Sequence, residues 1–108
     1  MDEFARALRL RRETARQRVA FIETDIDVGI TFLRLALTEL DMRNLARVDE
    51  LLANARIAYA ATAKLLPEMA ELEEWQRLHD EHQALADAIR EVERRKHRQE
   101  EEKGARSA

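Results

Sequence analysis

The fold of this chain is decided by residues 26–40, IDVGITFLRLALTEL. Polar residues in this stretch are nearly confined to one narrow helical stripe, formed by Asp27, Thr31, Arg34 and Thr38. A helix that packs against a single neighbour needs an apolar arc of only about 100°. Because almost every other position here is apolar, the stretch predicts a helix that is covered over most of its circumference.

The same helical pattern continues toward the N-terminus. Apolar residues recur at intervals of three, four and seven, at Phe4, Leu8, Ala15, Val19, Ile22, Ile26, Leu33, Leu37 and Leu40. We predict one continuous helix over residues 3–40, and Gly29 on its apolar face indicates close approach of another helix. The pair Thr24-Asp25 resembles a helix start and leaves an alternative, a break near residues 24–25 that would give four helices.

Two short connections divide the rest of the chain. Residues 41–44 combine Asp and Asn, which favour turns, and Asn44 is a suitable N-cap for a second helix over 44–65. Pro67 predicts the end of that helix and the start of a third, over 67–98. Short connections place successive helices antiparallel. The predicted fold is all-α, an up-down-up antiparallel bundle of three long helices in a single domain over residues 1–99, with a charged, disordered tail over 100–108.

Composition excludes several classes of protein. The chain has only two glycines and one proline, fewer than the turns of a sandwich or barrel require. It has no cysteine, so it has no disulfide framework, thiolate zinc site or cysteine nucleophile, and we expect a cytoplasmic protein. No stretch approaches the roughly 18–20 apolar residues of a membrane span, so we expect no membrane partner. Arginine exceeds lysine several-fold, which is typical of a GC-rich bacterial genome.

Two groups of residues could carry chemistry. His79 and His82 lie three positions apart on one helical face and could share a metal or bind a small ligand, but the Glu-x-x-His and HExxH patterns are absent. A basic stretch could contact phosphates; it consists of Arg6, Arg9, Arg11, Arg12, Arg16 and Arg18. Acidic residues interrupt it, and no aromatic residues are interleaved. We predict a non-enzymatic protein with no catalytic residue, no metal site, no cofactor and no nucleic-acid partner.

Residues 33–59, LRLALTELDMRNLARVDELLANARIAY, resemble a single tetratricopeptide-type helical hairpin. Leu35-Ala36 corresponds to the large–small pair of the first helix, and later spacings match at Leu45, Val48, Leu52 and Ala55. Arg43 stands where the repeat usually has its turn glycine, and only one unit is present. The resemblance implies a protein-binding scaffold, so one alternative is a monomeric adaptor that binds a peptide in its groove.

Helix lengths point to self-association. A helix over residues 3–40 spans about 57 Å, whereas the second helix returns only about 33 Å. Residues 3–18 would then lack a partner within the chain although they carry apolar side chains. We predict a homodimer, and a helical interaction protein that also binds protein partners. The residues expected to form the self-association surface are Phe4, Leu8, Ala15, Val28, Phe32 and Leu35.

Overall fold

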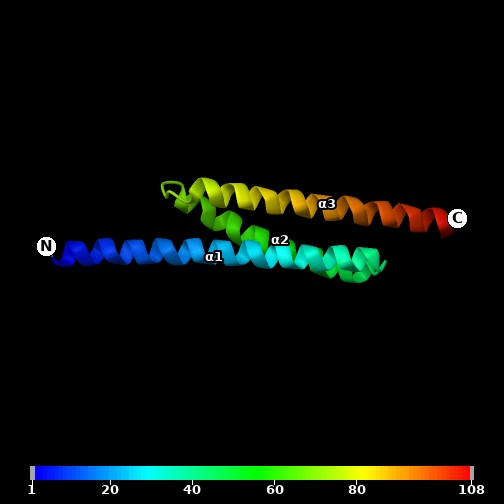
Figure 1. The fold of residues 1–108 in the computed structure, drawn as a ribbon, viewed down its shortest axis with the longest axis horizontal. Helices are drawn as coiled ribbons and strands as arrows, with labels where there is room; N and C mark the ends of the chain where they lie inside the picture. The colour runs from blue at the N-terminus through cyan, green and yellow to red at the C-terminus, as the bar shows by residue number, and fades with distance from the viewer. Residues whose placement is uncertain (1, 108) are drawn as a thin grey trace.

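Three long helices run up, down and up in a computed structural model that describes residues 2–107 (Figure 1). They are α1 (Asp2–Asp41), α2 (Leu45–Leu65) and α3 (Trp75–Ser107), and a short 3-10 helix, η1 (Leu66–Met69), follows α2 directly. The described residues contain no strand. This architecture confirms the predicted all-α, three-helix bundle.

The first helix is continuous over 40 residues, as predicted, and does not break near residues 24–25. Its buried face runs through that point without interruption, because Ile22 and Ile26 are both buried. Gly29 lies on the same face, where a Cβ atom would stand 3.0 Å from Leu85 Cδ1 and 3.5 Å from the Ala58 Cβ. The missing side chain therefore lets α3 come close to α1, which confirms the interpretation of Gly29 from the sequence.

The turn between α1 and α2 follows the predicted pattern. The Asn44 side chain accepts a hydrogen bond from the Arg47 backbone N–H at 3.4 Å and caps α2. Arg43 has a φ of 58°, the left-handed conformation that commonly ends a helix. The Arg43 and Asn44 N–H groups donate to the carbonyl oxygens of Leu40 and Glu39, so the end of α1 is satisfied before the chain reverses.

The core lies where all three helices overlap. Its largest fully buried side chains include Ile22 from α1, Leu51 and Leu52 from α2, and Leu78 and Leu85 from α3. Each fully buried aliphatic side chain contributes about 1.5–3 kcal/mol relative to leaving it exposed. The overlap region is thus the stable body of the molecule.

The start of the third helix was predicted wrongly. Pro67 opens η1 rather than α3, and α3 begins at Trp75 instead of residue 67. Leu66 and Met69 are buried, so this short helix is held against the core. A loop over residues 70–74 then turns the chain, with the Leu72 N–H donating to the Met69 carbonyl at 3.0 Å. Burial of two apolar side chains here outweighs the helix propensity of the loop residues.

The tail was also predicted wrongly. Residues 100–107 continue α3 as helix, whereas we expected disorder from residue 100; Ala108 lies outside the described residues. The Lys96–Glu100 ion pair, one turn apart at 3.2 Å, supports this segment, and His97 Nε2 lies 3.0 Å from the Glu101 carboxylate. Gln99 Nε2 also donates to the Leu40 carbonyl at 2.8 Å and ties α3 to the end of α1.

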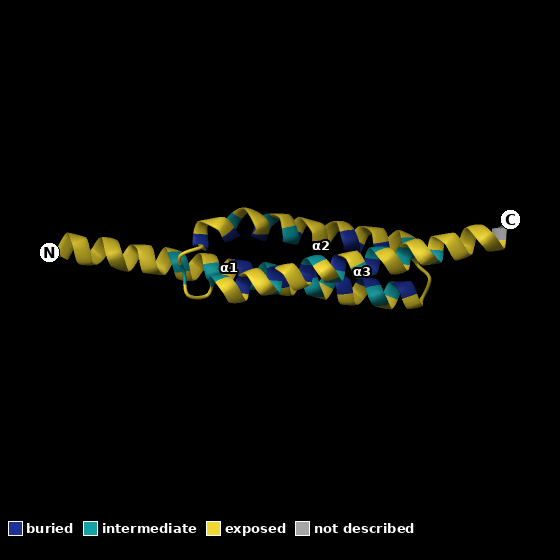
Figure 2. Ribbon diagram, turned by 90° about the horizontal axis from the view of Figure 1, so that it is seen from above, coloured by how far each residue is buried: buried dark blue, intermediate teal, exposed yellow. Residues whose placement is uncertain are grey.

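The molecule is a rod of 76 × 19 × 16 Å, and its two ends consist of single helices. Figure 2 shows the N-terminal part of α1 and the C-terminal part of α3 projecting from opposite ends of the bundle, exposed all round. Residues 2–14 are all exposed. We call residues 2–18 the α1 overhang, because its helix continues beyond most of the bundle.

Candidate interaction surface

The α1 overhang carries apolar side chains that nothing within the described chain covers. Phe4 is 71% exposed and Leu8 is 39% exposed, whereas Ala15 is half-buried at the edge of the bundle. These three residues continue the helix face that becomes fully buried from Ile22 onward. The overhang thus extends the core-facing stripe of α1 past the end of the core.

A second apolar stripe lies on a different face of α1, along the body of the molecule. Val28 and Leu35, both predicted for the self-association surface, are 40% and 47% exposed. Phe32, also predicted, is half-buried and packs against the core. The six predicted residues therefore divide between two faces of α1 and do not form one patch.

Three further exposed apolar residues belong to the second stripe and were missed from the sequence. Phe21 is 48% exposed, Leu10 is 57% exposed and Met42, just after α1, is 69% exposed. The signal that could have found them is spacing, because Phe21, Val28, Leu35 and Met42 recur every seven residues.

Threonines along this stripe have their hydroxyl groups bonded to their own helix. Thr14, Thr31 and Thr38 donate to the carbonyl oxygens of Leu10, Asp27 and Arg34, at 2.9, 2.9 and 3.3 Å. A hydroxyl hydrogen that is already bonded within the helix does not need a partner across an interface. Two residues of the predicted polar stripe, Thr31 and Thr38, can therefore be covered by a partner without leaving an unpaired hydroxyl donor.

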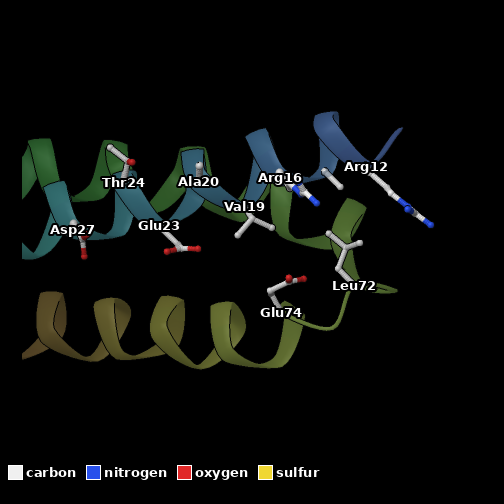
Figure 3. Close-up of a pocket in the computed structure, with 10 residues that line it drawn as sticks. Arg12, Arg16, Val19, Ala20, Glu23, Thr24, Asp27, Leu72 and Glu74 are labelled. Carbon is white, nitrogen blue, oxygen red and sulfur yellow. The ribbon is translucent and has the colours of Figure 1, made fainter. Parts of the chain in front are cut away.

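A hollow of about 500 Å³ lies where the overhang meets the bundle, between α1 and the loop over residues 70–74 (Figure 3). Figure 3 shows Val19, Glu23 and Asp27 projecting from α1 toward the side on which α3 lies. Glu23 forms an ion pair with Arg77 at 3.2 Å, and hydrogen bonds from Arg77 to Glu23 and Glu81 raise the pKa of the guanidinium group. Side chains of both charge signs line the hollow, because Arg12 and Arg16 lie there together with Glu23 and Asp27.

The two histidines proposed as a ligand pair are held by different aromatic residues. His82 is 7% exposed, stacks on Tyr59 with ring centroids 4.1 Å apart, and lies with its Nε2 3.1 Å from the Tyr59 carbonyl oxygen. His79 is more exposed and stacks on Trp75 at 4.8 Å. Within residues 2–107, no three His, Cys, Asp or Glu side chains are grouped so that they could hold a metal ion.

The six arginines of the basic stretch predicted from the sequence, Arg6 to Arg18, all lie on exposed positions of the α1 overhang. Arg18 forms an ion pair with Glu68 at 3.5 Å, which links the overhang to η1.

In the segment that resembles a tetratricopeptide hairpin, Ala36 is fully buried while Leu35 faces outward, and Val48, Leu52 and Ala55 are buried against α1 or α3.

Comparison of the chain with protein-family models, with characterised proteins and with solved structures found no match. Among the described helices, none is both long and apolar enough to cross a membrane.

Proposed function

We propose that this chain is a non-enzymatic helical interaction protein that forms a homodimer through α1 and binds a protein partner in that form. The observation that carries the proposal is the α1 overhang. A helix of this length is marginal in water without tertiary contacts. Here it also presents Phe4, 71% exposed, and Leu8, 39% exposed, on the face that elsewhere forms the core.

The second apolar stripe of α1, which faces outward and which we call the outward stripe, supports the same proposal. Phe21, Val28 and Leu35 are each between 40% and 48% exposed and lie on the long helix that carries the overhang. Contiguous exposed apolar surface is a mark of interaction sites in soluble proteins. Twofold pairing is the commonest oligomer symmetry and buries one such surface on both copies at once.

Mass in solution tests the homodimer. Light scattering at micromolar concentration is expected to give about twice the chain mass of 12.6 kDa. Replacing Phe21 and Leu35 together by Glu should shift the protein toward the monomer, because two charges would enter the surface that the partner covers. Ile57→Glu is the control, since Ile57 is an exposed apolar residue on α2, 67% exposed, and should leave the mass unchanged. A mass of one chain at high concentration would refute the dimer.

The alternative is the tetratricopeptide-like adaptor, which would bind a peptide as a monomer. It shares the hairpin of α1 and α2 but requires the outward stripe to remain free for the peptide. The same mass measurement separates the two, because an adaptor keeps the mass of one chain at every concentration. A ligand site at His79 and His82 is less favoured, because His82 would have to leave both its stacking partner Tyr59 and its hydrogen bond.

A further inference from the structure

The outward stripe of α1 has a seven-residue repeat with two positions in each repeat. The first position holds Thr14, Phe21, Val28, Leu35 and Met42. The fourth position holds Leu10, Gln17, Thr24, Thr31 and Thr38. All ten residues are exposed, and we call them the α1 seam.

This spacing is that of the contact positions of a two-stranded coiled coil. Apolar side chains hold the first position over four successive repeats, Phe21, Val28, Leu35 and Met42, whereas the fourth position after Leu10 holds Gln17 and three threonines. At about 100° per residue, the α1 seam lies roughly 140° around the helix from the buried face. It is thus a second contact face, formed in addition to the one that packs on α2 and α3.

We propose that a second copy of the chain docks along the α1 seam in the antiparallel direction, with Phe21 of each copy opposite the partner's Thr24. This inference rests on the proposed self-association and adds the surface, direction and register. Two positions flank the seam in each repeat: the residue just before a first-position residue, and the residue just after a fourth-position residue. In an antiparallel pair, each kind of flanking residue faces a residue of the same kind on the partner. The charges at these flanking positions therefore choose the register.

The proposed register places opposite charges together on both flanks. Glu13 faces the partner's Arg34, and Arg18 faces the partner's Asp25. Twofold symmetry repeats each pair, so the interface has four attractive contacts of these two kinds. All four side chains come from residues at the edge of the α1 seam; Glu13, Arg18 and Arg34 are exposed and Asp25 is half-buried. Arg18 also forms the ion pair with Glu68 of its own chain, at 3.5 Å.

Other arrangements bring like charges together. A shift of one heptad in one direction places Asp25 opposite the partner's Asp25, and a shift in the other direction places Arg18 opposite the partner's Arg18. A parallel pair in register keeps two attractive pairs, Glu13 with the partner's Arg18 and Arg34 with the partner's Glu39, but it brings Arg6 toward the partner's Arg11 and stacks the two overhangs on each other, away from both bundles. Like charges that face each other across an interface disfavour that pairing.

The antiparallel register also gives the α1 overhang a support. Leu10 comes to lie against the partner's Leu35, and Thr14 against the partner's Thr31. Leu10 is 57% exposed and Leu35 is 47% exposed in a single chain, and this contact would bury them against each other. The overhang of each copy then lies along the body of the other, where the helix is held by the core.

Charge reversal tests the register. At low salt, Glu13→Arg and Arg34→Glu should each raise the dimer dissociation constant about tenfold, measured by sedimentation equilibrium, because each change makes two repulsive pairs. The double variant should return to within about threefold of the original, since both pairs are restored with reversed sign. Arg9→Glu is the matched control, the same charge change on an exposed α1 residue outside the seam. In the parallel arrangement the double variant would dissociate most, because each new side chain would face a like charge, the partner's Arg18 or the partner's Glu39.

Disulfide trapping gives an independent readout, because the natural chain has no cysteine. The Thr14→Cys and Thr31→Cys variants, once mixed and oxidised, should form a covalent dimer. Neither variant alone should do so, since identical residues would be about 25 Å apart along the axis. Trapping by Thr14→Cys alone, or a dissociation constant that ignores the charge reversals, would overturn the seam while the dimer itself stands. A chain that remains monomeric throughout would overturn the proposed function as well.

Discussion

Single residues of the core decide how firmly α1 and α2 hold together. Leu33 is 3% exposed and Ala55 is fully buried, in the region that the sequence had indicated as the packed centre. The sequence showed this because large residues on α1 face a run of small residues on α2. Close approach of the two helices follows from that pairing of sizes.

Truncating Leu33 tests this packing. Leu33→Ala should lower the free energy of unfolding by about 2–5 kcal/mol, because it removes buried methyl groups and leaves a cavity. Ala55→Glu should cost more than Leu33→Ala, since it forces a charge without a partner into the core. Urea unfolding measures both, and Ile57→Ala, at a site 67% exposed, is the control that should change little. Equal midpoints for all four proteins would show that another face is buried.

At the level of elements, the sequence predicted what depends on local signals. Helical periodicity gave the continuous α1, and Asn44 marked the start of α2, because both are written in the spacing and chemistry of neighbouring residues. The start of α3 was missed, because residues 70–74, AELEE, contain good helix formers and no breaker. What interrupts the helix there is burial of Leu66 and Met69 against the core, which is a tertiary effect.

The end of α3 and part of the α1 seam were missed for related reasons. The hydrogen bond from Gln99 to the Leu40 carbonyl joins residues 59 positions apart and leaves no local trace in the sequence. Val28 and Leu35 were recognised because their surroundings are unusually apolar. Leu10 lies among arginines and Phe21 lies between Ala20 and Ile22, so the seven-residue interval, and not the local composition, places them on one face.

Ion pairs on α3 should make its stability depend on pH. Hydrogen bonds from Arg94 and then Arg95 hold the pKa of Glu91 below its ordinary value of 4.5. A carboxylate whose pKa is lowered in the folded state stabilises the fold above its unfolded pKa, and this contribution is lost as pH falls through the folded pKa. Glu91→Gln should therefore lower the urea midpoint at neutral pH, and this effect should shrink at acid pH as Glu91 becomes protonated. An effect of the same size at both pH values would show that the two arginines do not act through the charge.

The whole molecule is a rod of 76 Å with single-helix ends, and this shape makes the proposed dimer measurable by small-angle X-ray scattering. Antiparallel pairing centred between Phe21 and Thr24 offsets the two bodies, so the dimer should have a maximum dimension of about 90 Å at 1.5 Å per residue. A parallel dimer in register would keep the 76 Å length of one chain and only thicken. Scattering that fits the shorter length at twice the mass would contradict the antiparallel arrangement.

The close contact at Gly29 also has a mechanical consequence. The Leu85 side chain lies over the one position on the inner face of α1 that has no side chain, 3.0 Å from where a Cβ would stand. One turn away in either direction along α1, Leu85 would meet Ile26 or Leu33, both of them bulky and buried. Sliding α3 along α1 by one turn, about 5.4 Å, would therefore drive two large side chains into the same space. Force applied to either protruding end should therefore move α1 and α3 together as one rigid body.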